Sequence, residues 1–274
     1  MSAFQFKTSM NTSTLRPFSL DAPAQLRACA AAGFQGAELW VRDIRAFREA
    51  GGSLPDLGKL ARDLGIEVFD GIAFFKWEDA DPAVREAEIE KAKEEMGMLA
   101  AMGCGAVAAP PWGDTENVTV EDCAECFARL WTAGRELGVE PYLEMWGHRG
   151  NIRSVGAAAA VLERSGIRGA RLLVDPIHIH KGGGSFADLS ALPHGSIGVV
   201  HVNDFLLSTN RAHLTDKDRR FPGEGEADLE LFRDMVLRTG YRSYLSLELF
   251  IEDYGGWTVD EVARRGLESI RKVF

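Results

Sequence analysis

The feature that most constrains the fold is a strand-and-helix rhythm that recurs along the whole chain. Eight short apolar runs are each followed by a polar turn and an amphipathic stretch, often rich in alanine. We expect β-strands at residues 5–10, 36–41, 66–74, 105–110, 139–146, 170–176, 196–204 and 244–250. We expect helices at roughly 22–32, 54–64, 80–102, 119–137, 153–165, 186–191, 228–239 and 258–272. Such alternation indicates parallel strands joined by crossover helices.

The length favours one closed barrel. Dividing 274 residues among eight units gives about 34 residues per unit, which suits a (β/α)8 TIM barrel. No break in composition and no linker interrupts the rhythm, so the sequence predicts a single domain over residues 1–274. An open doubly wound sheet is the alternative, but no Gly-x-Gly-x-x-Gly follows the first apolar run.

Charge and hydropathy exclude some partners. The chain carries 31 Lys and Arg against 41 Asp and Glu, a net charge of −10, which argues against a binder of duplex nucleic acid. No apolar run approaches the roughly 20 residues that a membrane helix needs, so we expect no membrane partner. The first residues lack a basic start followed by an apolar stretch, and we therefore expect a cytoplasmic protein.

Polar residues close most of the apolar runs. In a barrel the carboxyl ends of the strands meet at one rim, where functional groups gather. An ionisable group buried alone is costly, so several of them at equivalent positions indicate a shared use. The residues at or just beyond the run ends are Asn11, Glu38, Asp70, Trp112, Glu144, Asp175 with His178, His201 with Asp204, and Glu248.

Four of these residues form a chemically sensible metal site. They come from the fifth to the eighth run, which are neighbours around a barrel: Glu144, Asp175, His201 and Glu248. Three carboxylates and one imidazole favour Mn²⁺, Mg²⁺ or Co²⁺, and Zn²⁺ also fits. We expect one divalent ion, because no second carboxylate cluster is evident. Taken singly, each residue could instead be an ion-pair partner or a hydrogen-bonded core residue.

Several segments carry a family resemblance. The chain resembles the sugar phosphate isomerase/epimerase family of xylose isomerase-like TIM barrels, and most of all its 2-keto-myo-inositol (inosose) isomerase branch. Together with the eight-unit rhythm, the resemblance covers essentially the whole chain. The segments are LEMWGH (143–148), LLVDPIHIH (172–180), VVHVNDF (199–205), LTDKDRRFPGEGEADL (214–229) and LSLELF (245–250).

The resemblance implies roles for individual residues. The four candidate ligands match the metal ligands of the family, and Glu144 and Glu248 also match the pair of carboxylates that moves protons. His178 matches a contact to a substrate hydroxyl, and Arg219 matches a basic residue that meets a substrate oxygen. Members of the family are often dimers or tetramers, so the resemblance also implies a homo-oligomer.

The aromatic residues expected at the rim suit a sugar-like ligand but do not identify it. The bulky residues Phe75, Trp77, Trp112 and Trp146 depart from the inosose branch. We interpret Trp112 and Trp146 as pocket walls, since aromatic faces suit the apolar side of a sugar ring, with core packing as the alternative. Glu38 is a candidate contact to substrate or to a metal ligand, and a structural ion pair is an equally good interpretation.

The chemistry that fits this set begins with proton removal beside a ketone. Loss of the proton from an α-hydroxy-ketone leaves charge on two adjacent oxygens, which a divalent cation can stabilise. A second carboxylate can return the proton, which gives an isomerase or epimerase of a sugar or cyclitol ketone. If a leaving group lies β to the carbonyl, the same start gives a lyase, acting on a 3-keto-glycoside or on 3-dehydroshikimate.

Two other classes share the barrel. A DNA-repair endonuclease needs several zinc ions, and the net charge of −10 and the few histidines at strand ends count against it. A non-catalytic sugar-binding barrel would not need two flanking carboxylates.

Overall fold

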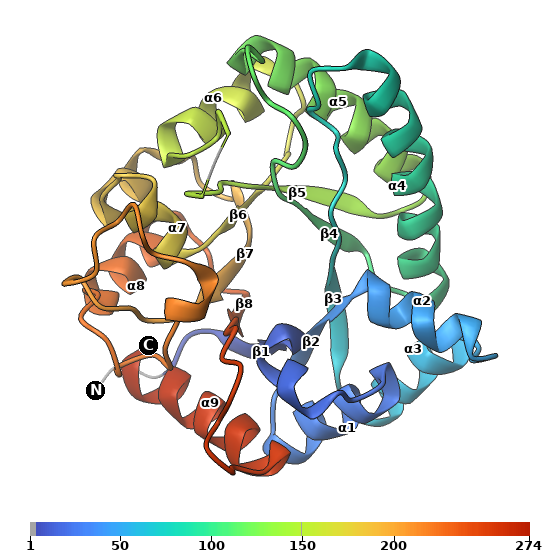
Figure 1. Ribbon diagram of the computed structural model, residues 1–274, viewed down its shortest axis with the longest axis vertical. Helices are drawn as coiled ribbons and strands as arrows, with labels where there is room; N and C mark the ends of the chain where they lie inside the picture. Colours follow the sequence, from blue (N-terminus) through green and yellow to red (C-terminus); the bar gives the residue numbers. More distant parts are fainter. Residues whose placement is uncertain (1–3, 149) are drawn as a thin grey trace.

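The computed structural model describes residues 4–148 and 150–274. Within these residues, eight parallel strands follow one another around a closed barrel in sequence order, with helices outside them (Figure 1). The predicted TIM barrel is therefore confirmed. The strands are β1 (Lys7–Asn11), β2 (Gly36–Trp40), β3 (Glu67–Ile72), β4 (Ala106–Ala109), β5 (Glu140–Glu144), β6 (Leu172–Val174), β7 (Ile197–Val202) and β8 (Tyr244–Leu247).

The α-helices lie between the strands and after β8. They are α1 (Ala22–Ala32), α2 (Val41–Glu49), α3 (Leu54–Asp63), α4 (Pro82–Met102), α5 (Val120–Glu136), α6 (Val155–Arg164), α7 (Pro176–Lys181), α8 (Leu229–Arg238) and α9 (Val259–Val273). Three short 3-10 helices complete the described elements: η1 (Thr12–Phe18), η2 (Phe186–Ala191) and η3 (Asp216–Asp218). No helix in this part of the chain is long and apolar enough to cross a membrane.

Local sequence signals fix many helix ends. The longest helix, α4, begins after Asp81, whose side chain accepts a hydrogen bond from the backbone N–H of Ala83. It ends at Gly103, whose φ of 86° is the left-handed conformation that glycine adopts without strain.

Two helices differ from the sequence prediction. Helix α2 starts at Val41, directly after β2, whereas the run 36–41 was expected to be strand throughout. Helix α7 starts at Pro176, so the expected strand over 170–176 shrinks to Leu172–Val174. Both helices follow their strand without a polar turn, and α7 has only six residues, too few to show a helical period.

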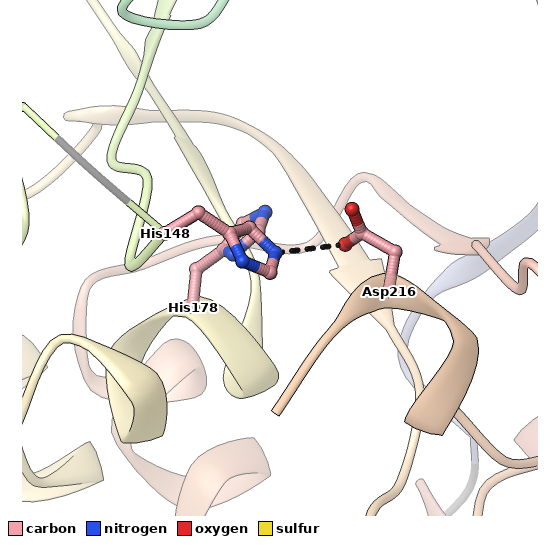
Figure 2. A group of neighbouring side chains, drawn as sticks. All are labelled: His148, His178 and Asp216. Atoms are coloured by element: carbon pink, nitrogen blue, oxygen red, sulfur yellow. Dashed lines mark hydrogen bonds and ion pairs between the residues drawn. The ribbon is translucent and has the colours of Figure 1, made fainter. Parts of the chain in front are cut away.

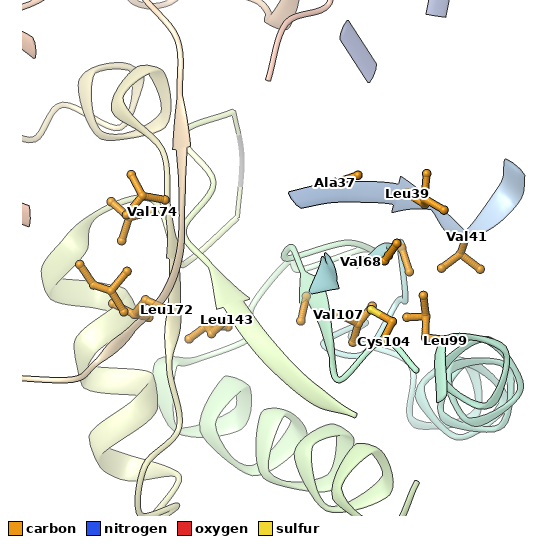
Figure 3. Close-up of a cluster of buried hydrophobic side chains, with 14 of the residues drawn as sticks. Ala37, Leu39, Val41, Val68, Leu99, Cys104, Val107, Leu143, Leu172 and Val174 are labelled. Carbon is orange, nitrogen blue, oxygen red and sulfur yellow. The ribbon is translucent and has the colours of Figure 1, made fainter. Parts of the chain in front are cut away.

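The barrel closes where β8 pairs in parallel with β1, placing Ser9 opposite Ser246. All eight strands point the same way, so their carboxyl ends share one rim. The main hydrophobic core lies between strands and helices, and Figure 3 shows Leu39, Val68 and Val107 near Leu99 of α4. A smaller cluster fills the barrel interior and consists of Trp40, Ile72, Ala106, Ala108, Tyr142, Leu173 and Val199.

Aromatic rings fill the interior so closely that some positions admit only glycine. A Cβ atom built on Gly198 of β7 would lie 2.6 Å from the Tyr142 ring.

Candidate functional site

Three of the four predicted ligands converge at the carboxyl rim. Asp175 directly follows β6, His201 lies in β7 and Glu248 directly follows β8. Each offers one ligand atom, and these atoms lie within 4.8 Å of one another. We call these residues the metal triad. All three are buried, with Asp175 fully so.

The His201 ring is oriented by a carboxylate on its far side. Its Nε2 lies 3.1 Å from Glu38 Oε1, while its Nδ1 lies 3.1 Å from Glu248 Oε2 and 3.8 Å from Asp175 Oδ2. Nδ1 is buried, and its contact with Glu248 is an ion-pair contact without aligned hydrogen-bond geometry. Burial opposes protonation of this ring, but Glu248 and Glu38 outweigh burial and raise the pKa of His201 well above its usual value.

This donor set fits a divalent cation. An imidazole nitrogen with no hydrogen bond faces two carboxylates, which is a mixed nitrogen and oxygen set that Mn²⁺, Co²⁺ or Zn²⁺ accepts. The contact from Glu38 is the outer-shell partner that a metal-binding histidine usually has.

Glu144, the fourth predicted ligand, stands beside the metal triad rather than within it. It ends β5, and its Oε1 lies 3.5 Å from His178 Nε2. Burial raises the pKa of Glu144 well above its usual value, and Glu248 and Asp175 add to the effect. The structure thus brings the residue to the site without joining it to the three converging ligand atoms.

Arg219 lies at the centre of the polar groups. Its guanidinium Nη1 donates to Asp175 Oδ2 at 2.8 Å and also contacts Glu248 Oε2. Its Nη2 donates to Asp216 Oδ1 at 2.8 Å and lies 3.3 Å from His178 Nε2. Burial alone would raise the pKa of Glu248, but Arg219 and His201 outweigh it and hold the pKa below its usual value.

A second group of ligand-type side chains lies next to the first. His148, His178 and Asp216 place their ligand atoms within 4.8 Å of one another, and His148 Nε2 is 3.1 Å from Asp216 Oδ1 (Figure 2). The sequence analysis found no second carboxylate cluster, and this group contains a single carboxylate that Arg219 already engages. Burial and the charge of Arg219 lower the pKa of His178 well below its usual value.

The site contains an inner cavity and an outer space that share lining residues. The inner cavity has a volume of about 30 Å³ and includes Glu144, His178, His201, Arg219 and Glu248 in its lining. The outer space, which we call the vestibule, measures about 750 Å³, which is the size of a small-molecule pocket. Both spaces are lined by Trp40, Phe74, Trp146, Asp216 and Phe250.

Aromatic rings form one wall of the vestibule. Trp112 lies 5.6 Å from Trp146 and 5.2 Å from Phe74, measured between ring centroids. Trp40 lies 5.7 Å from Phe74. Trp112 and Trp146 therefore line a pocket as the sequence predicts, whereas Phe75 and Trp77 are fully buried in the core.

Asn11 connects the wall to the metal triad. Its side-chain nitrogen donates to Glu248 Oε1 at 2.9 Å, and its oxygen accepts from Trp40 Nε1 at 2.8 Å. The position of the indole and the position of the carboxylate thus depend on one amide.

Other strand-end residues support the site from outside. Glu38 lines neither space; it is fully buried behind His201 and accepts a hydrogen bond from Ser246 Oγ. Asp204 points away from the site, and its carboxylate accepts from the backbone N–H groups of Phe205, Gly223 and Ala227. It thereby anchors the loop that follows Arg219.

Sequence reasoning missed several residues of the site. Asn203 donates to both oxygens of Asp175, at 3.1 and 3.2 Å, and its place beside Asp204 in VVHVND was the available signal. Trp40 and Asp216 had weaker signals: Trp40 is the next-to-last residue of an apolar run, and Asp216 begins DKDR. Arg16 had none, because it lies in the unpredicted helix η1.

The fold and this rim define a (β/α)8 barrel with a buried set of candidate metal-ligand side chains at the carboxyl ends of its strands. Residues 26–273 match the family model described as xylose isomerase-like TIM barrel, and the chain belongs to this family. The resemblance inferred from sequence is confirmed at the family level.

Named relatives divide between two activities. A 3-dehydroshikimate dehydratase of Pseudomonas aeruginosa is 28% identical over 90% of this chain, which spans only 39% of that relative. An inosose isomerase of Bacillus velezensis is 26% identical over 81% of this chain and 80% of its own length, which supports the inosose isomerase branch.

Solved structures share the fold. The crystal structure of the IOLI protein with a bound zinc atom has a TM-score of 0.89, at 22% identity, over 97% of both chains. A D-psicose 3-epimerase determined in the presence of D-fructose has a TM-score of 0.78, at 18% identity, over 97% of this chain and 99% of that one.

Proposed function

We propose that the protein is a divalent-metal-dependent isomerase or epimerase of a polyhydroxy ketone, an inosose or a ketose. The observation that carries the proposal is the convergence of the buried metal triad beside an inner cavity that two further acid–base groups line. We propose a single resident ion, Mn²⁺, Mg²⁺, Co²⁺ or Zn²⁺, held by Asp175, His201 and Glu248 with Glu144 as the fourth ligand. The cytoplasmic location and a homo-oligomeric state stay predictions.

The chain's own residues supply proton transfer and orientation. A divalent cation at the metal triad would stabilise the negative charge that develops on two adjacent substrate oxygens. A carboxylate oxygen of Glu144 or Glu248 takes the proton from the carbon beside the carbonyl, and the other carboxyl group returns one to the neighbouring carbon or the opposite face. Arg219 and His178 line the same cavity and orient the substrate oxygens.

The second candidate is a dehydratase that uses the same first step. Asp216 lines the inner cavity, and its carboxylate lies 3.1 Å from His148 Nε2, so the imidazolium form of His148 would be the proton donor to a departing hydroxyl group. Proton removal by a carboxylate and loss of the β-hydroxyl as water balance the reaction. The relatives named 3-dehydroshikimate dehydratase favour this candidate.

A proton NMR time course in D₂O separates the candidates. The metal-loaded protein is mixed in separate tubes with an inosose, a ketohexose, a 3-keto-glucoside and 3-dehydroshikimate. Deuterium beside the carbonyl with an accumulating isomer supports the isomerase. Loss of a β group supports the lyase.

A control variant and a check of metal occupancy make the experiment decisive. The variant Asp175→Asn removes one charge from the metal triad and should lose both metal binding and exchange. If no tube shows exchange while the wild-type protein demonstrably holds metal, the proposed substrate class is wrong.

A further inference from the structure

A partly buried arginine stands in the vestibule without a charge partner. Arg16 belongs to η1, which follows β1 directly, and its guanidinium carbon lies 3.9 Å from the ring centre of Trp40 and 4.7 Å from that of Phe250. Among the described residues no carboxylate lies within ion-pair distance of Arg16, and its buried Nε has no hydrogen-bond partner. Burial and the nearby charge of Arg42 lower the pKa of Arg16 to about 10.

The carboxylates that line the same space are already neutralised. Asp216 is bound by Arg219 at 2.8 Å, and Glu252 is bound by Lys217 at 2.7 Å. Among the described residues that line the vestibule, the charge without a carboxylate partner is therefore that of Arg16, and Arg42 adds a cation that pairs with Asp43 at 3.3 Å. Arg42, on the exposed rim, engages Asp43 only through its Nε.

Hydrogen bonds hold in place the Trp40 ring against which Arg16 stacks. Trp40 donates its indole N–H to Asn11, and Asn11 also accepts a hydrogen bond from Ser13 N at the start of η1. A guanidinium fixed on such a surface presents its remaining N–H donors in the planar fork that matches two oxygens of one anion.

We propose that the substrate carries an oxyanionic group, a carboxylate or a phosphate, which Arg16 binds in the vestibule with help from Arg42. The hydroxy-ketone end of the same molecule would then face the inner cavity, because Trp40 and Phe250 line both spaces. This inference rests on the proposed function in that it assumes a ketone at the metal triad. It narrows the proposed substrate class from polyhydroxy ketones in general to those that carry an oxyanionic group.

Matched ligands test the inference by binding. Isothermal titration of the metal-loaded protein compares 3-dehydroshikimate with its methyl ester, and D-fructose 6-phosphate with D-fructose. We expect the charged member of at least one pair to bind wild-type protein at least about tenfold more tightly. The pair that discriminates tells carboxylate from phosphate.

Substitutions test whether the two arginines cause the preference for charged over neutral ligands. Arg16→Gln should weaken the charged ligand about 10- to 100-fold and leave its neutral partner unchanged, because only the charge-assisted hydrogen bonds are lost. Arg42→Gln should have a smaller effect of the same kind, and Arg16→Lys should recover part of the loss. Arg48→Gln, which removes a cation of α2 that already pairs with Glu94, is the matched control and should change nothing.

The outcomes distinguish this inference from the proposed function. It is overturned if wild-type protein binds both members of each pair alike, if it binds neither anion, or if Arg16→Gln weakens charged and neutral ligands equally. Charge-selective binding that depends on Arg16, without deuterium exchange in any ketone, would leave the inference standing and refute the proposed function. Deuterium exchange in a neutral inosose, together with equal binding of charged and neutral ligands, would support the proposed function and overturn this inference.

Discussion

Replacing Glu38 with glutamine should weaken metal binding without unfolding the barrel. Glu38 accepts a hydrogen bond from His201 Nε2 at 3.1 Å and another from Ser246, and all three side chains are buried. The contact fixes the ring so that Nδ1 faces Asp175 and Glu248. An amide of the same size keeps an acceptor oxygen but removes the charge that holds this tautomer.

The expected size follows from what is lost. Removing an outer-shell partner of a metal-binding histidine typically lowers metal affinity about 10- to 100-fold, which is roughly 1.4–2.7 kcal/mol. Glu38→Ala is harsher, because it leaves two buried donors without an acceptor and should cost about 2–6 kcal/mol of folding stability. The two variants therefore separate an effect on the metal site from an effect on the fold.

Competition with a chromogenic chelator measures the affinity of each variant for Co²⁺ and Zn²⁺, and circular dichroism checks the fold. Ser246→Ala is the control, since it removes the other hydrogen bond to Glu38 but leaves the one to His201 in place. An affinity for Glu38→Gln within about threefold of wild type would refute the argument that Glu38 orients His201.

Three further predictions concern catalysis, packing and pH. Glu248→Gln should abolish turnover of any ketone that the wild-type protein converts while leaving the fold intact by circular dichroism; near-normal activity would remove Glu248 from the mechanism. Gly198→Ala should cost about 1–3 kcal/mol in denaturant titration, because its Cβ would lie 2.6 Å from the Tyr142 ring; unchanged stability would mean that the ring can shift. Burial tends to raise the pKa of Asp79, but hydrogen bonds from the backbone N–H groups of Asp114 and Asp81 outweigh it and lower the pKa. The ionised form therefore stabilises the fold at neutral pH, and Asp79→Asn should cost on the order of 1 kcal/mol at pH 7, a difference that shrinks as the pH falls below about 3.9; a cost independent of pH would contradict this.

The sequence predicted the repeating parts of the molecule well. All eight strands and the longer helices have strong periodic patterns and clear caps, such as Asp81 and Gly103 around α4. Helices α2 and α7 were missed because each continues its strand without a turn. As a result, the strand expected over 170–176 was predicted too long: only three of its residues form β6.

The candidate site was predicted in its ligand types but not in its detailed geometry. Strand ends placed Asp175, His201 and Glu248 on one rim, as observed. The alternation of side chains along a strand could not show that Asp204 turns outward to hold a loop while Asn203 turns inward to Asp175. Arg16 and Asp216 come from connecting segments, where no periodicity predicts a direction.

The amide of Asn11 has a consequence for altering the specificity of this protein. Because it joins Trp40 of the pocket wall to Glu248 of the metal triad, a change at Trp40 removes one of the two hydrogen bonds that the Asn11 oxygen accepts and loosens the amide that binds Glu248. A substitution at Trp40 then changes both the pocket wall and the support of Glu248. A variant library that randomises Trp40 alone is therefore expected to contain many proteins with reduced activity. Varying Trp112, which packs against Phe74 and Trp146, would change the recognition of ligands while the hydrogen bond from Asn11 to Glu248 stays intact.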